Sequence, residues 1–475
     1  MIGVLTLTVL LPIIAIPISY AISKYAKWKT GYIIGFLLLI NLALLQCLEM
    51  PQKEVLAKAT IIGDLSFYID GLSFFVVFVI LLLTSVISFY SAEYMEKERW
   101  PGHYYALYLL YTAGMLGTVL STNLIQFFMF FELMLLPSWA LIAVWGTGRR
   151  DIASFKYFMY TEFGAIFIMA GTALIYAASG RFDILEVARN IQQVNLAIMG
   201  AIVFSIGLMV KMAVFPLHFW LPDAHAEAPT PISALLSPAM IGIGGYAMLR
   251  VIYQAVPQIL AISEINYALF LLGSITLIYG GLNALAQRDF KRLLAFSSIS
   301  QMGYMLLGIS AFNVIGVIGA ILLYVSHGLC KAILFMAAGI LSHETGTRDI
   351  TKLRGLASKM PLTTVLVLIG FLGLAGVPPI LGFWSELYIF LGVINTAISS
   401  GNLIYILLVI IVIILSLLTA GYGLWVVRRV FYGEATEALE KVEDPIEMIL
   451  PLLILAIVAV VLGIYPTFVL QTISL

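Results

Sequence analysis

Charged side chains are scarce in this chain, which carries 25 lysines and arginines and 25 aspartates and glutamates among 475 residues. The charged share of 11% compares with about 25% in ordinary soluble domains. Hydrophobic residues make up 62% of the chain, and the mean hydropathy is +1.06. The composition therefore predicts an all-α polytopic membrane protein, and the formal net charge of zero argues against nucleic acid as a partner.

Residues that could hold a redox group are also few. The two cysteines, Cys47 and Cys330, lie in apolar stretches and form no metal-ligand pattern. The chain contains neither a glycine-rich nucleotide fingerprint nor a haem-attachment motif. We therefore expect no cofactor and no metal site in this chain, so that any redox chemistry belongs to other chains.

Long apolar runs are abundant, and the first of them lacks a cleavage site of small residues, so we expect a retained helix. Because about 20 apolar residues span a bilayer, fourteen spans can be placed. Residues 181–193 read as a short surface helix, and residues 53–69 as an extramembrane hairpin. The fourteen expected spans are 2–23, 31–48, 70–92, 104–121, 123–145, 152–179, 194–220, 229–252, 264–286, 292–310, 314–341, 361–396, 403–427 and 447–470.

The distribution of basic residues predicts the orientation of these spans. With the N-terminus outside, seventeen basic residues, from Lys24 to Lys441, fall in cytoplasmic loops and five on the opposite side. The other three, Lys156, Lys211 and Lys331, lie within spans. We therefore expect both termini on the outer side of a prokaryotic cytoplasmic membrane, bacterial or archaeal.

Two spans are interrupted by proline. Pro216 lies in the span 194–220, and Pro378 and Pro379 lie in the span 361–396. Proline removes a backbone donor and clashes with the preceding turn, so both helices should be discontinuous. A Phe-Trp pair follows each break, and the breaks lie five spans apart. Broken helices at corresponding positions of two halves are typical of inverted-repeat transporters.

Ionisable residues occur at membrane depth near the first break. Lys211 lies five residues before Pro216, and a charge at the bilayer centre costs at least about 2.5–3.5 kcal/mol. Glu132, which has apolar neighbours for about two turns on each side, is its natural partner. A pair that opens and closes would let Lys211 release a proton. The alternatives are a static structural pair, or a lysine that reaches the membrane interface beside an ordinary helix end.

Further candidates follow along the chain. His327 and Lys331 are four residues apart, so they share a helix face and could relay protons. Glu386 follows the second break, where it could load or release protons or simply end a solvated helix. Glu162 is also within a span and could supplement the relay or face a neighbouring subunit.

A polar cluster follows the first break and contains His218 and His225 together with Asp223 and Glu227. These residues lack metal-ligand spacing on one helix face. We interpret the cluster as a vestibule for proton uptake or as a loop anchor, and not as a metal site.

Five segments together resemble the antiporter-like membrane subunits of respiratory complex I, membrane-bound hydrogenases and Mrp-type sodium/proton antiporters. The resemblance covers nearly the whole chain. The segments are KMAVFPLHFWLPDAHAEAPTPISALLS, FFELMLLPSWALIAVWG, SHGLCKAILFMAAG, GVPPILGFWSELYIF and DGLSFFVVFVILLLTSVISFYSAEYM.

The resemblance implies fourteen transmembrane helices with two inverted five-helix repeats and a central polar axis. Its divisions would be residues 1–103 (helices one to three), 104–252 (first repeat), 253–431 (second repeat) and 432–475 (helix fourteen). It also implies other membrane subunits as partners, with iron–sulfur or nickel–iron centres in those partners.

By motif match, the resemblance also assigns roles to residues. Glu132 looks like the family's coupling glutamate, Lys211 its partner, and His327 and Lys331 the central relay. Glu386 matches the terminal position, where a glutamate is typical of the chain M branch.

One departure from the family pattern bears on function. The expected helix-eight lysine is absent from LLSPAMIGIGGYAMLRV, where the matching position is about Gly242. The leading hypothesis is a proton-translocating subunit of a redox-driven oxidoreductase or translocase complex, with no redox catalytic site of its own. Alternatives are a subunit of a Mrp-type sodium/proton antiporter and a scaffold subunit that does not conduct.

Overall fold

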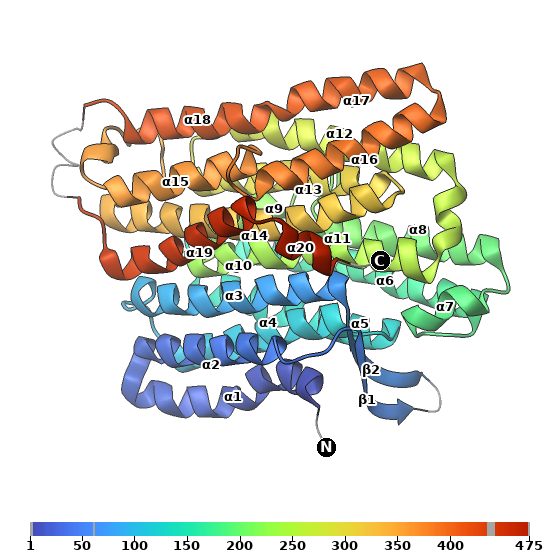
Figure 1. Cartoon of the computed structure of the whole chain (residues 1–475). Coiled ribbons are helices and arrows are strands. Elements are labelled where there is room, and N and C mark those ends of the chain that lie inside the picture. Colours follow the sequence, from blue (N-terminus) through green and yellow to red (C-terminus); the bar gives the residue numbers. More distant parts are fainter. Residues whose placement is uncertain (1–2, 60–61, 435–441, 474–475) are drawn as a thin grey trace.

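A computed structural model describes residues 3–59, 62–434 and 442–473 of the chain. Lys441, one of the basic residues counted above, lies outside the described residues. The long helices run side by side, nearly parallel or antiparallel to one another (Figure 1). The chain fills this stack roughly in sequence order, except that α19 (Ile446–Ile464) returns to pack against α3 (Gly71–Tyr94).

Among the described residues, eleven helical stretches are long and apolar enough to cross a membrane. The first of these, Val4–Leu45, consists of two packed helices, α1 (Val4–Ala26) and α2 (Thr30–Leu45), joined by the turn η1 (Lys27–Lys29). The chain is therefore a polytopic, mostly α-helical membrane protein. The expected total of fourteen crossings stays a prediction.

The N-terminal part contains the one sheet among the described residues. Strands β1 (Gln52–Ala59) and β2 (Gly63–Ile69) pair antiparallel, which confirms the hairpin expected at 53–69. The predicted surface helix forms as α7 (Ile184–Asn190), with Asp183 as its N-cap. The other helices of this part are α4 (Pro101–Leu120), α5 (Leu124–Trp145) and α6 (Arg150–Ser179).

The span expected at 229–252 is not a uniform α-helix. It consists of α10 (Thr230–Leu235), the π-helical turn η2 (Leu236–Met240), α11 (Ile241–Leu249) and a second π-helical turn, η3 (Arg250–Ala255). Pro238, within η2, has no backbone N–H to give to the preceding turn, so the regular α-helical pattern cannot continue through it. All of the most apolar window of this span is buried.

The remaining helices form the C-terminal half of the stack and its connections. They are α8 (Val194–Lys211), α9 (Leu221–Glu227), η4 (Pro257–Ala261), α12 (Ser263–Leu285), α13 (Phe290–Ser310), α14 (Val314–Thr345), η5 (Leu356–Ser358), α15 (Pro361–Leu374), α16 (Gly382–Ser400), α17 (Leu403–Ser416), α18 (Leu418–Phe431) and α20 (Thr467–Thr472).

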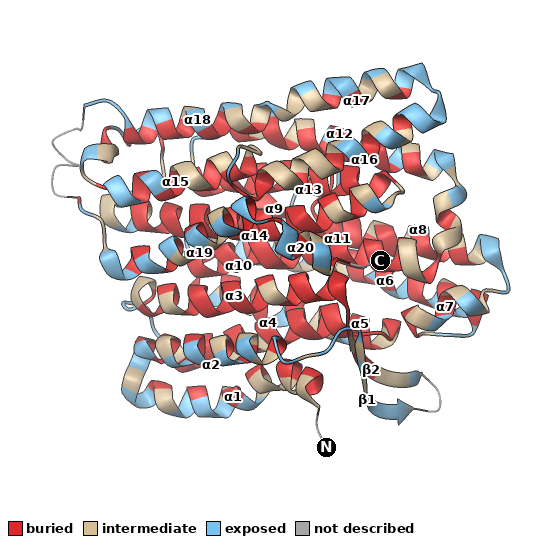
Figure 2. Cartoon of the chain, viewed as in Figure 1, coloured by how far each residue is buried: buried red, intermediate tan, exposed pale blue. Residues whose placement is uncertain are grey.

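Burial divides the helices into an inner and an outer set (Figure 2). Helix α14 contacts α3, α13, α15, α16 and α19, and nearly every residue from Gly316 to Leu341 is buried. By contrast, only 22% of the most apolar window of Leu403–Phe431 is buried. Apolar side chains exposed on the outer helices suit lipid or a neighbouring membrane protein. The inner helices carry most of the buried polar side chains.

Close packing of α6 on α8 fixes the position of the first helix break. A Cβ atom added at Gly207 would lie 2.5 Å from the carbonyl oxygen of Gly164. Small residues let two membrane helices approach closely and gain van der Waals contact. The α6–α8 pair therefore holds Glu162 and Lys211 on adjoining helices.

Candidate functional site

The first helix break lies directly after Lys211. Helix α8 ends at this residue and α9 begins at Leu221, so the segment that contains Pro216 is not α-helical. The indole nitrogen of Trp220 donates to the Val210 carbonyl at 2.9 Å and ties the far end of the break back to α8. The C-terminal end of a helix carries a partial negative charge, which favours a cation at the end of α8.

Lys211 is buried, with 1% of its surface exposed, and its Nζ has no hydrogen-bond partner among the described residues. The ammonium lies 5.0 Å from the ring centroid of Phe131 and 5.5 Å from that of Tyr157. Aromatic faces attract a cation without a directed hydrogen bond. Lys211 can therefore exchange partners without first breaking a strong one.

Two carboxylates lie near Lys211. Glu132 of α5 and Glu162 of α6 are half-buried neighbours, and both act electrostatically on the lysine. The direct ion pair expected between Glu132 and Lys211 is not formed, because no described carboxylate oxygen lies within 4.0 Å of the Lys211 Nζ. The proximity of Glu132 to Glu162 was not anticipated, since the two residues lie on different helices.

Lys331 and His327 lie at the centre of the inner helices. The Lys331 ammonium is fully buried and donates to the Leu294 carbonyl at 2.8 Å and to the Ser297 hydroxyl. The His327 ring is also buried, and neither of its nitrogens has a partner in the described part of the chain. Lys331 is thus anchored to α13, while His327 keeps both nitrogens available.

The second break separates α15 from α16 and contains Pro378 and Pro379. The carboxylate of Glu386 folds back against this break, since a Cβ at Gly376 would lie 2.6 Å from its Oε2 atom. Gly376 has a φ of +66°, so glycine suits both the backbone and the close approach. The other carboxylate oxygen of Glu386 is buried without a described partner.

Polar side chains along α13 connect the centre to the second break, and sequence reasoning missed them. Ser297, Gln301 and Tyr304 are spaced by four and three residues, so they share one helix face. Ser297 bonds Lys331, and the Gln301 side-chain nitrogen donates to the Leu374 carbonyl at 3.1 Å. The Tyr304 hydroxyl donates to the Ser416 carbonyl at 3.2 Å and lies within electrostatic reach of the Glu386 carboxylate. The signal was available in the segment FSSISQMGYM, a polar run within an apolar span.

The polar cluster after the first break has two parts. Asp223 forms ion pairs that anchor the loop, whereas His218 and His225 are buried. Asp223 bonds Lys156 at 2.8 Å and also pairs with Arg292, so it ties α9 to α6 and α13. His218 packs between aromatic rings, 5.6 Å from Phe215 and 4.6 Å from Tyr279 between centroids.

His225 is fully buried and stacks on Phe335 at 5.0 Å, and neither of its ring nitrogens has a described partner. It lies within electrostatic reach of Lys291, Lys331 and His327. Lys291 is buried, and its ammonium donates to the Ala228 carbonyl. A pocket of about 350 Å³ beside Lys291 is lined by further polar groups, among them Thr147, Thr230 and Arg348. The pocket therefore extends to Lys291, which lies within electrostatic reach of His225.

Metal ligands are not gathered anywhere in the described ranges, which contain no group of three or more histidine, cysteine, aspartate or glutamate residues suited to an ion. The site is therefore built from amines, carboxylates, imidazoles and hydroxyls. Groups of these kinds transfer protons between neighbours.

Comparison with known proteins matches most of the chain to one family of membrane subunits. A family model described as "NADH:quinone oxidoreductase/Mrp antiporter, TM" matches residues 121–419. A second, described as "NADH-Ubiquinone oxidoreductase (complex I), chain 5 N-terminus", matches residues 60–105.

Two curated relatives are similar over most of the chain. NAD(P)H-quinone oxidoreductase chain 4 1 of Synechococcus elongatus is 38% identical over 78% of this chain and 68% of its own length. Subunit M of the F(420)H(2) dehydrogenase of Methanosarcina mazei is 33% identical over 94% of this chain and 91% of its own.

Among solved structures, a chain of the membrane-bound sulfane sulfur reductase, an archaeal respiratory membrane complex, superposes with a TM-score of 0.86 at 27% identity. The match covers 98% of this chain and 95% of that one. The chain therefore belongs to the NADH:quinone oxidoreductase/Mrp antiporter family and is an antiporter-like membrane subunit.

Proposed function

We propose that this subunit moves protons across the membrane within a redox-driven complex, along its buried polar side chains. The observation that carries the proposal is the placement of Lys211 and Glu386 at two helix breaks, with Lys331 between them. Buried ionisable groups are expensive in a membrane, so a series of them is retained where it serves transport. The second half of the path runs from Lys331 through the polar face of α13 to Glu386. That face consists of Ser297, Gln301 and Tyr304.

The first half of the path provides the coupling. Lys211 rests on aromatic faces near Glu132 and Glu162, without a direct bond to either carboxylate. Movement of a carboxylate towards Lys211 would stabilise its charged form, and movement away would favour release of its proton. A neighbouring subunit that displaces Glu132 could therefore drive a proton from Lys211 towards Lys331.

Uptake is proposed to begin at the pocket beside Lys291. In the expected orientation this pocket faces the cytoplasm, and His225 lies within electrostatic reach of Lys291 and of the central pair His327 and Lys331. Release would occur at Glu386 on the outer side. His218, packed among aromatic rings, is assigned to holding the break instead of carrying protons.

The proposed assembly follows from the relatives. Both curated relatives are named as subunits of oxidoreductases, so we infer electron transfer in partner subunits that carry iron–sulfur or nickel–iron centres. We also propose fourteen membrane crossings with both termini outside a prokaryotic membrane. Two inverted five-helix repeats at residues 104–252 and 253–431 would lie between N-terminal helices (1–103) and a last helix (432–475).

Two other functions have specific support. The family description includes Mrp antiporters, in which a sodium gradient would replace electron transfer as the drive. The absence of a lysine at Gly242 would suit a scaffold that does not conduct.

The test is proton uptake by membrane vesicles that hold the native complex, measured together with electron transfer. Lys211→Ala should abolish the share of coupled uptake contributed by this subunit, while the complex still assembles and transfers electrons. Lys352→Ala, at an exposed loop position, is the matched control and should behave as wild type.

Three outcomes would contradict the proposal. Normal coupled uptake in Lys211→Ala would favour the scaffold. Proton uptake that depends on an imposed sodium gradient and does not change when an electron donor is added would favour the antiporter. Loss of assembly in Lys211→Ala alone would give this lysine a structural role.

A further inference from the structure

The path proposed above has a gap between Lys211 on α8 and His327 on α14. The helix of residues 230–255 lies between them, and its position Gly242 offers no room for a side chain. A Cβ added there would lie 2.5 Å from Cδ2 and 2.6 Å from Cε2 of Tyr324. The ring of Tyr324 therefore occupies the space above Gly242.

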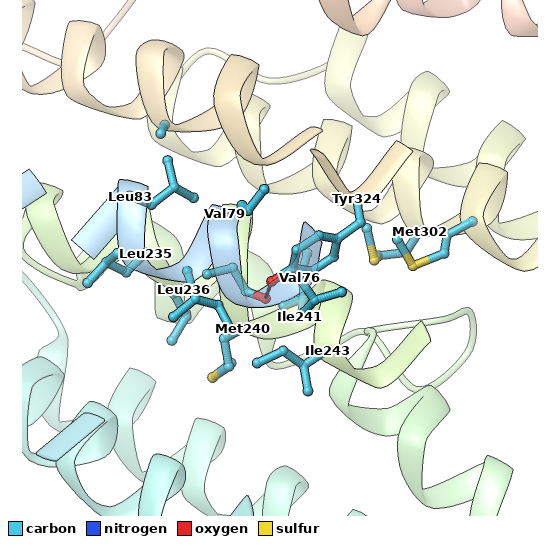
Figure 3. Close-up of a cluster of buried hydrophobic side chains, with 14 of the residues drawn as sticks. Val76, Val79, Leu83, Leu235, Leu236, Met240, Ile241, Ile243, Met302 and Tyr324 are labelled. Atoms are coloured by element: carbon cyan, nitrogen blue, oxygen red, sulfur yellow. Dashed lines mark hydrogen bonds between the residues drawn. The ribbon is translucent and has the colours of Figure 1, made fainter. Parts of the chain in front are cut away.

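Tyr324 joins α14 to the π-helical turn η2. The side chain is buried, with 1% exposed, and it is directed from α14 towards the segment that carries Met240 and Ile241 (Figure 3). Its hydroxyl donates to the Ala239 carbonyl at 3.1 Å. Because His327 follows three residues later on α14, the phenol and the imidazole lie on neighbouring parts of one helix face.

A second buried phenol, that of Tyr111, lies within electrostatic reach of Tyr324. The hydroxyl of Tyr111, on α4, is fully buried and has no hydrogen-bond partner among the described residues. The ionisable groups that act electrostatically on it are Tyr157 and Tyr324. Tyr111 thus lies within electrostatic reach of both tyrosines, and its hydroxyl has no described partner.

Tyr157 completes the connection to Lys211. Its ring lies under the lysine ammonium at 5.5 Å, and its hydroxyl shares a hydrogen bond of 2.7 Å with Ser138. The same hydroxyl approaches the Met240 sulfur at 3.4 Å, next to the carbonyl that Tyr324 bonds. Tyr157 and Tyr324 therefore reach adjacent residues of η2 from the Lys211 side and the His327 side, and Tyr111 is a third buried phenol near both.

We propose that Tyr157, Tyr111 and Tyr324 carry protons between Lys211 and His327, with Tyr324 in the place of a central amine. The inference rests on the proposed function and assigns residues to the step between Lys211 and His327. Each hydroxyl oxygen would accept a proton from one neighbour as its own proton passes to the next. One O–H bond forms and one breaks at each step, so no phenolate accumulates and no other reactant is needed. Rotation of the hydroxyls restores the starting state.

The experiment compares Tyr324→Phe and Tyr111→Phe with wild type in vesicles that hold the native complex. Phenylalanine keeps the ring over Gly242 and removes only the hydroxyl. Both variants should lower proton uptake per electron pair to the level of Lys211→Ala, with normal assembly. The matched control is Tyr90→Phe, which removes an equally buried hydroxyl that donates to the Met336 carbonyl of α14 at 3.0 Å.

A rescue separates proton transfer from packing. Gly242→Lys alone should fail to assemble, because its side chain would collide with Tyr324. Tyr324→Ala should assemble with reduced uptake, and the double variant Gly242→Lys/Tyr324→Ala should recover uptake because an amine fills the vacated space.

The outcomes distinguish this inference from the function on which it rests. If Lys211→Ala loses coupled uptake while Tyr324→Phe keeps it, the tyrosine link is wrong and the proposed function stands. If both variants keep normal uptake, the proposed function fails. If Tyr90→Phe loses as much uptake as Tyr324→Phe, the hydroxyls act through structure and the link is also wrong.

Discussion

Replacing Asp70 with asparagine should strongly destabilise the subunit, because Asp70 forms a buried ion pair with Arg250. The guanidinium nitrogens donate to the two carboxylate oxygens at 2.6 and 2.7 Å, and both side chains are largely buried. Asp70 also caps α3 by accepting from the Ser73 backbone N–H at 2.9 Å. Asparagine caps helices about as well as aspartate, so this substitution removes the charge and leaves the cap.

The expected cost can be worked out from the groups that remain. Removing one partner of a buried ion pair typically costs about 3–5 kcal/mol. Arg250 would still donate to the Tyr246 hydroxyl at 2.8 Å and to the Gln254 side-chain oxygen at 2.7 Å. We therefore expect the lower end, about 3 kcal/mol, for Asp70→Asn. In the double variant Asp70→Asn/Arg250→Met no buried charge is left, so much of this loss should be recovered.

The assay is the apparent melting temperature of the detergent-purified complex, with Asp151→Asn as a control. Asp151 makes only an exposed contact of 4.0 Å with Arg150, and surface pairs contribute about 0–1 kcal/mol. Asp70→Asn should lower the melting temperature by several degrees and the control by almost nothing. Equal effects of the two variants, or a double variant as unstable as the sum of the single ones, would refute the reasoning.

The same pair predicts a pH dependence. Burial alone would raise the pKa of Asp70, but the charge and hydrogen bonds of Arg250, together with Ser73, outweigh it and hold the pKa below its usual value. A lowered pKa in the folded state contributes stability above the unfolded pKa of about 3.9, and this is lost as the pH falls through the folded value. The stability difference between wild type and Asp70→Asn should be constant through the neutral range and shrink only below about pH 4.

Two further substitutions test the packing and the uptake route. Gly207→Ala should separate α6 from α8 and lower both the melting temperature and coupled uptake, because its Cβ would lie 2.5 Å from the Gly164 carbonyl oxygen. Gly421→Ala, where a Cβ would meet nothing within 4 Å, is the control for this change. Lys291→Met should slow proton uptake in vesicles without stopping electron transfer, because it removes the buried amine between the pocket and His225. An unchanged uptake rate would remove Lys291 from the route.

Features set by neighbouring residues could be predicted from the sequence. The hairpin at 52–69 and the helix at 184–190 follow from local patterns, and α-helix is absent around Pro216 and around Pro378 because proline acts on its own turn. The π-helical turn at 236–240 was not predicted, although Pro238 lies within the span expected at 229–252.

Contacts between distant residues could not be predicted in the same way. Asp70 and Arg250 are 180 positions apart, and hydropathy indicates only that both lie near span ends. The packing of Tyr324 over Gly242 likewise depends on how α14 crosses the helix of residues 230–255. The polar face of α13 is the exception, because its spacing was visible in the sequence.

The contacts also separate groups that are fixed from groups that can move. Lys331 is held by two hydrogen bonds to α13, whereas Lys211, His327 and one oxygen of Glu386 have no described partner. Lys211 and Glu386 lie beside the two proline breaks, where the backbone makes few α-helical hydrogen bonds, so backbone shifts there break few of them. A proton pump needs some ionisable groups whose contacts change during the cycle. It also needs a group between them whose contacts stay the same. We therefore expect a driving movement in a partner subunit to be felt at the two breaks first, with Lys331 as the fixed point between them.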